Sequence, residues 1–394
     1  MSPLDKKIRV LHIITLFSVG GATETVISIA KGLMLRNYDI TVVSGPFIES
    51  EGDMLPVAIE AGIKVIIIPE LRRNIHPIHD IRAFYRLRKM IREGRYDVVH
   101  THSSKAGIIG RLAAYYEGVQ NIVHTIHGLP FHHYQNHFAR LLYILVERFT
   151  AKRCSKLIAV SHKIIQESLN AGIGSTDQFE VVRSGFDVQP FINNSLKNSK
   201  LMTDLKIQDG DFVLGNISRL SPLKGHAILI DILPKLKKRI PQLKLLFIGD
   251  GKIRHSLEQK ATAINLKESV IFAGSIPPSN IPQYLSLMDI VVHTSLHEGL
   301  ARVLPQALVM GKPVVTYSLD GAPEVIQDGY NGYLVEALNK DELINSICDI
   351  FQQYKQFESR CLLDKGKIIH EFSEDKMVME TENTYKMLIE NKLN

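Results

Sequence analysis

Short apolar runs alternate with longer amphipathic stretches along most of the chain. The first run, residues 8–15 (IRVLHIIT), is almost continuously apolar, as is typical of a strand buried on both faces of a parallel sheet. Similar runs predict further strands in the first half at residues 40–43, 64–68, 96–100, 122–125, 157–160 and 179–182. Helical stretches separate most of these runs, and repeated strand–helix units indicate a parallel sheet with helices on both faces.

The alternation stops once, near the middle of the chain. Residues 189–210 are rich in Asn, Ser and Lys and have little periodicity, so we interpret this segment as the connection between two domains. Strands are predicted again at residues 212–218, 243–248, 270–272, 290–293, 313–317 and 333–335. We therefore expect an α/β protein with an N-terminal domain at residues 1–190 and a C-terminal domain at residues 205–370.

Composition and charge narrow the class of protein. Of the 394 residues, 45% are hydrophobic and 22% are charged, which is ordinary for a globular protein with two domains. A formal net charge of +6 is too diffuse, and too little interleaved with aromatic residues, to indicate nucleic-acid binding. Three cysteines without framework spacing predict buried thiols in a reducing compartment. The chain has no apolar run of about 18 residues and no signal-peptide pattern, so we expect a cytoplasmic protein.

The stretch from Ser295 to Gly311 (SLHEGLARVLPQALVMG) joins a polar loop to a helical pattern. Its apolar positions predict a helix that begins near Ala301 and places Pro305 close to the first turn. The backbone N–H groups at the start of such a helix lack intrahelical partners and can bind an anion. Glu298 lies just before this end and Gln306 lies eight residues later, about 12 Å apart if the segment between them is helical. The two side chains could therefore contact opposite ends of one ligand.

This stretch resembles the E-x7-E signature of the retaining glycosyltransferases of family 4, which have the GT-B fold. The resemblance covers nearly the whole chain and implies two Rossmann-like parallel-sheet domains that face each other across a cleft. It also implies that a C-terminal helix at residues 373–394 packs back on the first domain. In the family, the first Glu holds the donor sugar and the second holds the ribose. Glu298 matches the first; Gln306 replaces the second, and it either still offers an acceptor and a donor to the ribose diol or merely faces water.

Further residues match the donor site of the family. Arg219 and Lys224 follow the strand at residues 212–218 and resemble an R-x4-K element whose two cations clamp the donor diphosphate. The alternative is that they are two solvated loop cations. The paired glycines after the first strand resemble the family's glycine loop, although they can equally form a plain tight turn. The resemblance thus implies donor contacts from Gly20, Gly21, Gly274, Ser275, Ile276, Gly299, Leu300, Ala301 and Arg302.

Histidines gather after two of the predicted strands. His100 and His102 precede Lys105, and His124 and His127 follow about twenty residues later. Metal binding is one interpretation, but the spacings match no zinc pattern, so we expect no metal site. The resemblance implies instead that His127 borders the donor sugar, and that His102 and Lys105 line the acceptor side. His100 and His124 are expected to bond to the backbone at strand ends.

Two stretches combine basic and apolar residues. Residues 77–94 predict a basic amphipathic helix, which can either rest on an anionic membrane surface or form a solvated outer helix packed on the sheet. Residues 138–153 mix bulky apolar residues with arginines, and we expect them to cover the sheet as part of the core.

The resemblance implies an enzyme that moves a sugar from a UDP- or GDP-linked donor, with retention, to a hydroxyl of a lipid-linked or polysaccharide acceptor. The catalytic roles fall to His127, Glu298, Arg219 and Lys224. The nucleotide sugar is a co-substrate, and we expect neither a cofactor nor a metal, because fixed cations can stabilise the leaving group. The partners are a nucleotide sugar, a glycan or lipid-linked acceptor and, through residues 77–94, an anionic membrane at its inner face.

Three other functions stay open. An epimerase of the same fold would release a free sugar without an acceptor, and a non-catalytic protein would bind the nucleotide sugar without turnover. A dinucleotide-dependent oxidoreductase is disfavoured because the G-x-G-x-x-G pattern is absent. The sequence does not identify the donor sugar, the base, the acceptor, the linkage or the oligomeric state.

Overall fold

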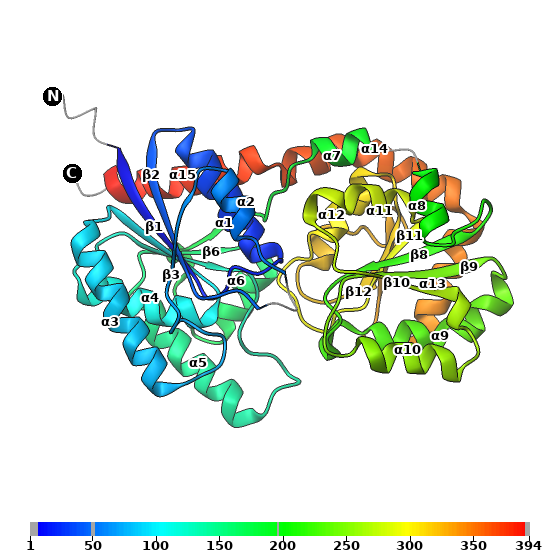
Figure 1. Ribbon diagram of the computed structural model, residues 1–394, viewed down its shortest axis with the longest axis horizontal. Helices are drawn as coiled ribbons and strands as arrows, with labels where there is room; N and C mark the ends of the chain where they lie inside the picture. Colours follow the sequence, from blue (N-terminus) through cyan, green and yellow to red (C-terminus); the bar gives the residue numbers. More distant parts are fainter. Residues whose placement is uncertain (1–6, 49–51, 195–196, 391–394) are drawn as a thin grey trace. The chain divides into compact units, whose positions relative to one another are not determined.

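The computed structural model describes residues 7–48, 52–194 and 197–390. The chain divides into two compact units, the first comprising Met1–Phe186 with Glu374–Asn394 and the second comprising Asp187–Ser373. Each unit is built on one parallel sheet (Figure 1). The fold is therefore α/β, as the alternating pattern predicts. In the described part of the chain, no helix has both the length and the apolarity needed to cross a bilayer.

The first unit has a seven-stranded sheet in the order β3-β2-β1-β4-β5-β6-β7. Its strands are β1 (Ile8–Ile14), β2 (Tyr38–Ser44), β3 (Lys64–Ile67), β4 (Val98–His102), β5 (Ile122–Ile126), β6 (Lys156–Ala159) and β7 (Phe179–Val181). Its helices are α1 (Gly21–Met34), α2 (Leu55–Glu60), α3 (Pro77–Gly94), α4 (Ser104–Tyr116), α5 (His137–Ala151), α6 (His162–Asn170), the short η3 (Thr176–Gln178) and α15 (Glu374–Glu390). The strand order reverses between β1 and β4, so the loops after these two strands meet where such sheets usually bind ligands.

The second unit has a six-stranded sheet in the order β10-β9-β8-β11-β12-β13. Its strands are β8 (Phe212–Ile217), β9 (Leu243–Ile248), β10 (Val270–Gly274), β11 (Ile290–His293), β12 (Val314–Tyr317) and β13 (Gly332–Val335). Its longer helices are α7 (Gln189–Asn193), α8 (Ser199–Asp204), α9 (His226–Arg239), α10 (Arg254–Ala263), α11 (Ile281–Leu287), α12 (Val303–Val309), α13 (Lys340–Gln352) and α14 (Tyr354–Phe372), and its short turns are η4 (Pro222–Lys224), η5 (Lys267–Ser269), η6 (Pro278–Asn280) and η7 (Ala322–Glu324). Here the order reverses between β8 and β11.

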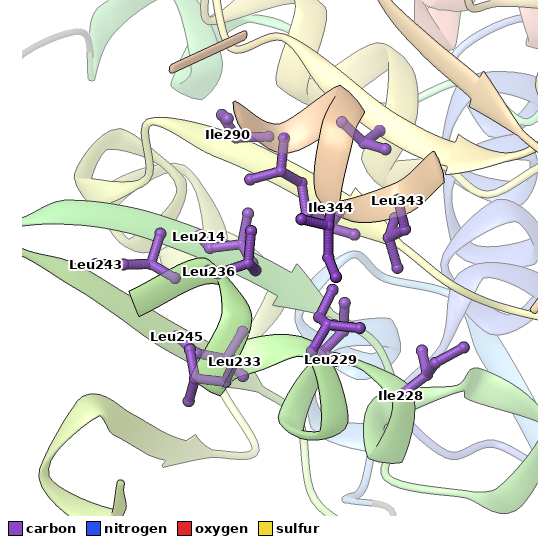
Figure 2. Packing of buried hydrophobic residues seen from close by; sticks show 14 of the residues in the cluster. Leu214, Ile228, Leu229, Leu233, Leu236, Leu243, Leu245, Ile290, Leu343 and Ile344 are labelled. Carbon is purple, nitrogen blue, oxygen red and sulfur yellow. The ribbon is translucent and has the colours of Figure 1, made fainter. Parts of the chain in front are cut away.

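Buried apolar side chains from strands and helices form the core of the second unit. Figure 2 shows Leu245 of β9 beside Leu233 of α9 and Leu214 of β8 beside Leu236 of α9, with Leu343 and Ile344 contributed by α13. Each of these side chains is at most 4% exposed. Burying a Leu or Ile side chain stabilises a fold by about 1.5–3 kcal/mol, so this face of the sheet anchors the strands whose ends carry the candidate site.

The C-terminal helix α15 belongs to the first unit. It packs on α1, and Val378 lies against Gly32, where a Cβ would come within 2.5 Å of the Val378 side chain. Polar contacts reinforce the packing, since Arg36 Nη1 donates to Glu382 Oε2 at 2.8 Å. Figure 1 shows α1 and α15 on one side of the first sheet and α3, α4 and α5 on the other.

The structure corrects the expectation that residues 138–153 form part of the core. In α5 the buried positions are Glu147, Thr150 and Ala151, whereas five large apolar side chains are between 48% and 84% exposed. The exposed residues are Phe138, Leu141, Leu142, Leu145 and Phe149. The sequence pattern locates an apolar side of a helix, but it does not determine which side faces the sheet.

Four histidines lie buried within the first sheet. They are His12 of β1, His100 and His102 of β4 and His124 of β5, and none is more than 3% exposed. Most of their nitrogen atoms find partners: for example, His100 Nε2 lies 2.7 Å from Thr125 Oγ1 and His124 Nδ1 lies 2.9 Å from Thr101 Oγ1. Burial lowers the pKa of His12 to about 3, and it lowers the pKa values of the other three well below the ordinary value. The folded first unit therefore holds these histidines uncharged.

We predict that the protein loses stability steeply below pH 6.5. These four histidines titrate near pH 6.5 in the unfolded chain, but their pKa values are far lower in the folded one, so the unfolded state binds more protons as the pH falls and is favoured. At pH 5.5 each buried histidine should lower the free energy of unfolding by about 1.4 kcal/mol. Urea unfolding at pH 7.5 and pH 5.5 measures the difference.

His124→Asn removes one of these proton-binding groups, so the same difference should shrink by about 1.4 kcal/mol. His255→Asn, at an exposed position of α10, is the control and should leave the difference unchanged. An unaltered pH dependence in His124→Asn would contradict the prediction.

Candidate active site

Two loops at the carboxyl ends of β8 and β11 are joined in the second unit. Gly225, with φ of +73°, approaches Thr294 so closely that a Cβ would lie 2.1 Å from the Thr294 carbonyl oxygen. The Leu296 amide donates to Leu223 O at 2.8 Å, and Thr294 Oγ1 donates to Lys224 O at 3.2 Å. Residues about seventy positions apart in the sequence are thereby brought side by side.

This junction places Lys224 against Glu298. The Lys224 ammonium donates a hydrogen bond to Glu298 Oε1, and His293 Nε2 lies 3.4 Å from the same oxygen. The Glu298 side chain stays partly exposed, at 27%. Burial alone would raise the pKa of Glu298, but the charge of Lys224 and the contact with His293 outweigh it and hold that pKa well below its ordinary value. Glu298 is therefore an ionised carboxylate at neutral pH.

The backbone around Glu298 is held by the loop after β12. Asp320 Oδ2 accepts a hydrogen bond from the Glu298 amide at 2.6 Å, and the Gly321 amide donates to Gly299 O at 2.9 Å. A small pocket opens here, lined by His293, Ser295, Glu298, Gly299, Leu300, Ala301, Leu304, Thr316, Tyr317, Leu319, Asp320, Gly321 and Ala322. Four of the residues expected to contact the donor thus line one pocket.

The helix after this pocket starts later than the sequence predicts. Helix α12 begins at Val303 instead of near Ala301, and Arg302 is its N-cap. The eight positions from Glu298 to Gln306 therefore comprise a loop followed by about one helical turn, so the 12 Å distance for a continuous helix does not apply. Arg302 and Gln306 are half-buried, and the Gln306 amide donates to Arg302 O at 3.2 Å.

The loops after β8, β9 and β10 are also connected. The Leu220 amide donates to Asp250 O at 2.9 Å, and the Gly249 amide donates to Gly274 O at 2.8 Å. Gly274 has a φ of +79°, and Ser275 and Ile276 follow it at the surface of the loop. Arg219 begins the loop that ends at Lys224, and its side chain is exposed. These loops place the expected cationic and base-binding residues at one edge of the second sheet.

In the first unit, the paired glycines lead directly into α1. Gly20 is the N-cap, and its carbonyl accepts from the Glu24 amide at 3.1 Å. Apart from its chain neighbours, no described residue has an atom within 4 Å of the position a Cβ would take at Gly20. Helix α1 begins at Gly21, directly after this N-cap. Open space beside the backbone at Gly20 is compatible with a ligand that approaches the loop closely.

His127, expected beside the donor sugar, and His102 and Lys105, expected on the acceptor side, differ in their surroundings. His127 is half-buried and borders a cavity of about 240 Å³ that includes Ser104, Thr125 and Pro130. His102 is fully buried, and its Nδ1 lies 3.2 Å from His127 Nε2. Lys105 is bound by Asp80 Oδ1 at 2.5 Å and by the carbonyl of Asn74. Only His127 among the three has both a partly open surface and a place beside the cavity.

Three of the buried histidines could in principle supply metal ligands. Nitrogen atoms of His12, His100 and His102 lie within 4.8 Å of one another. However, His12 Nδ1 and His102 Nε2 are hydrogen-bonded at 3.0 Å, and His100 is engaged by Tyr385 and Thr125. A metal would have to replace these hydrogen bonds, so the donor set does not fit one as it stands.

Two residues of the site were not identified from the sequence. His293 is the last residue of β11, and Asp320 lies in the loop after β12, so both occupy the carboxyl ends of strands where α/β sheets bind ligands. Their place at the ends of predicted strands was the signal in the sequence that could have identified them. Each acts on Glu298, His293 through the carboxylate and Asp320 through the backbone amide.

Comparisons with known proteins find relatives that span both units. The family model described as Glycosyltransferase Family 4 matches residues 19–190, and the model described as Glycosyl transferases group 1 matches residues 198–361. The chain is 26% identical, over 100% of both chains, to the Escherichia coli UDP-Gal:alpha-D-GlcNAc-diphosphoundecaprenol alpha-1,3-galactosyltransferase.

A mycobacterial enzyme and a solved structure extend the likeness. The GDP-mannose-dependent alpha-(1-6)-phosphatidylinositol monomannoside mannosyltransferase of Mycolicibacterium smegmatis is 23% identical over 84% of this chain and 85% of its own. The crystal structure of Anabaena HepE in complex with UDP and glucose is 25% identical, with a TM-score of 0.81 over 96% of this chain and 100% of that chain. The chain belongs to the family 4, group 1 glycosyltransferases and is a glycosyltransferase with the GT-B fold.

Proposed function

We propose that this enzyme transfers a sugar, with retention, from a UDP- or GDP-linked donor to a hydroxyl of a lipid-linked or polysaccharide intermediate. The observation that carries the proposal is the contact between Lys224 and Glu298 at the edge of the pocket lined by Gly299, Leu300 and Ala301. A diphosphate beside the Lys224 ammonium has its sugar within reach of the Glu298 carboxylate. The names of the relatives support this donor and acceptor class, since they include UDP-galactose, GDP-mannose and diphosphoundecaprenol.

The second unit would hold the donor through groups of fixed charge. Lys224 and Arg219 neutralise the charge that grows on the leaving diphosphate. Glu298 stays ionised and accepts hydrogen bonds from sugar hydroxyls. The backbone of Gly274, Ser275 and Ile276 holds the base. The side-chain amide of Gln306 approaches the ribose, with Arg302 one helical turn earlier.

The first unit would supply the acceptor side and the edge of the reacting sugar. His127 flanks the anomeric carbon, Gly20 and Gly21 allow the diphosphate to approach the backbone, and Lys105 and His102 support the acceptor region. The leaving phosphate oxygen accepts the acceptor proton on the same face of the sugar, so no carboxylate nucleophile is required. Neither a cofactor nor a metal is needed for these steps.

We also propose that the outer face of α3 and α5 rests on an anionic membrane. The five exposed apolar residues of α5 lie on this face, and helix α3 adds Ile78, Ile81 and Tyr85, which are also exposed. Aromatic and arginine side chains join the helices through α4, since Arg153 lies over the rings of Phe149 and Tyr115, and Arg88 lies over Tyr116. Apolar side chains with flanking arginines are suited to the boundary between headgroups and acyl chains, and each basic residue adds about 1 kcal/mol on an anionic surface.

We predict that Lys224→Ala and Glu298→Ala each reduce sugar transfer by about 100-fold or more, because each removes a fixed charge from the donor site. Transfer is measured as product formed from radiolabelled UDP-galactose, UDP-glucose or GDP-mannose and lipid-linked acceptors. Lys235→Ala is the control, since Lys235 forms an exposed ion pair with Asp341 on the outside of the unit. Near-normal transfer by both variants would overturn the site, and release of free sugar without any acceptor product would indicate an epimerase.

Gln306→Glu should leave donor binding unchanged or improve it, because a carboxylate can accept two hydrogen bonds from the ribose diol. Thermal shift with the same three nucleotide sugars measures the effect. A donor at about a hundred times its dissociation constant should stabilise the wild type by about 2.7 kcal/mol, and the variant by as much or more. A variant that folds normally but no longer responds to the donor would assign Gln306 another task.

The membrane face is tested by vesicle sedimentation. Wild-type protein should bind vesicles that contain phosphatidylglycerol. The double variant Leu141→Glu/Leu145→Glu should weaken this binding at least about tenfold, because it places negative charges among the exposed apolar residues of α5. Leu363→Glu, at an exposed position of α14, is the matched control. Equal binding by the double variant would exclude the face, and a change in its oligomeric state without vesicles would mean that α5 contacts a second copy of the chain.

A further inference from the structure

Three histidines form a continuous hydrogen-bonded chain through the first sheet. His12 Nδ1 lies 3.0 Å from His102 Nε2, and His102 Nδ1 lies 3.2 Å from His127 Nε2. His12 and His102 are fully buried, whereas His127 is half-buried beside the cavity. The chain therefore connects the interior of the sheet to the one histidine that the proposed function places beside the donor sugar.

The rings meet edge to edge. The planes of His12 and His102 differ by 17° and their centroids are 5.2 Å apart, while those of His102 and His127 differ by 28° at 5.4 Å. In both pairs the centroids are much farther apart than the bonded nitrogens, so each hydrogen bond lies close to the ring planes. His100 packs against His102 at a centroid distance of 4.2 Å and holds the central ring in place.

The proton positions along this chain are constrained at its buried end. A neutral imidazole carries one proton, so the central ring donates one of its two bonds and accepts the other. His12 Nε2 is buried and has no partner among the described residues. A buried N–H without an acceptor is rarer than an unpaired acceptor, so this nitrogen is the unprotonated one. Nδ1 of His12 then donates to His102, and Nδ1 of His102 donates to Nε2 of His127.

The charge state of the chain agrees with this assignment. Burial lowers the pKa of His12 to about 3 and lowers the pKa of His102 well below its ordinary value, where neighbouring histidines lower it further. The neighbouring histidines bond to uncharged groups: Tyr385 and Thr125 bond to His100, and Thr101 bonds to His124. The charged residues nearby are Arg111 and Glu147, which pair with each other at 2.6 Å. Both buried rings are therefore neutral at neutral pH.

We infer that His102, held in turn by His12, is a positioning residue that fixes the ring plane of His127 and keeps the His127 proton on Nδ1. This inference rests on the proposed placement of His127 beside the donor sugar. A ring with one fixed tautomer presents the same polar edge to the reacting sugar in every turnover, whereas a ring free to exchange tautomers presents the wrong edge part of the time. The buried histidines thus serve the cavity without contacting the substrate.

The tautomer of His127 can be measured directly on the full chain. Long-range ¹H–¹⁵N NMR of histidine-labelled protein, with His127 signals identified by their loss in His127→Asn, should show protonated Nδ1 and bare Nε2 in the wild type. His102→Leu should give a mixture of tautomers. His102→Asn retains a polar group near the former Nδ1 and should restore the wild-type pattern at least in part. Tyr385→Phe removes a hydroxyl from the same buried cluster without touching the chain, and it should leave the pattern unchanged.

Kinetics give the functional consequence. Turnover is measured as the nucleoside diphosphate released from UDP-galactose, UDP-glucose or GDP-mannose. With the donor that is turned over, His102→Leu should lower kcat at least about tenfold with little change in KM, and His102→Asn should recover most of the loss. The inference is overturned if His127 keeps one tautomer in His102→Leu, if the wild type carries the proton on Nε2, or if elemental analysis finds stoichiometric zinc on these histidines. Should none of the three donors be turned over while the NMR result holds, the proposed function fails and the positioning of His127 by His102 stands.

Discussion

The close approach of Gly225 to Thr294 is the contact on which the donor site depends. No side chain fits at Gly225, because its Cβ would lie 2.1 Å from a backbone oxygen and its φ of +73° favours glycine. Without that approach, the loop after β8 could not run beside the loop after β11. Lys224 would then lose its contact with Glu298, although both residues would still occupy the ends of their own strands. The relative positions of Lys224 and Glu298 thus depend on the absence of a side chain at Gly225.

The buried apolar strands fix the positions from which these two loops start. Because β8 and β11 are neighbours in the sheet and both are buried, the positions at which their loops emerge are fixed by the packing of α9 and α13 beneath them. The two sheets place polar residues differently relative to this packing. The second has its ionised pair at the pocket edge, whereas the first carries neutral histidines inside the sheet itself. Desolvation explains the difference, since a charge buried as deeply as His100 or His102 would be very costly.

The strand pattern, the two-sheet architecture and the position of Glu298 next to a cation could be predicted from the sequence, because each depends on local residue order or on the resemblance to the family. The parts that could not be predicted depend on tertiary contacts. The orientation of α5 is one such part, because contacts with the rest of the unit decide which side of the helix is buried. In the structure Glu147 and Thr150 are buried, and the apolar side is exposed. His293 and Asp320 act through atoms that come close only after three strands have paired. The start of α12 at Val303 reflects the hydrogen bond that holds Gly299 in a loop.

The two kinds of polar residue have one consequence in common. Burial keeps His12 and His102 neutral, and Lys224 with His293 keeps Glu298 ionised. The pKa values of His12, His102 and Glu298 are all lowered away from neutral pH, so none of these three side chains exchanges a proton at neutral pH. A reaction that relied on one of them as a general base would be poorly served. The proposed transfer places no such demand on them, since the departing phosphate oxygen receives the acceptor proton. The electrostatics of this chain are therefore those of a fixed binding site for charge and hydroxyl groups, which is what that route requires.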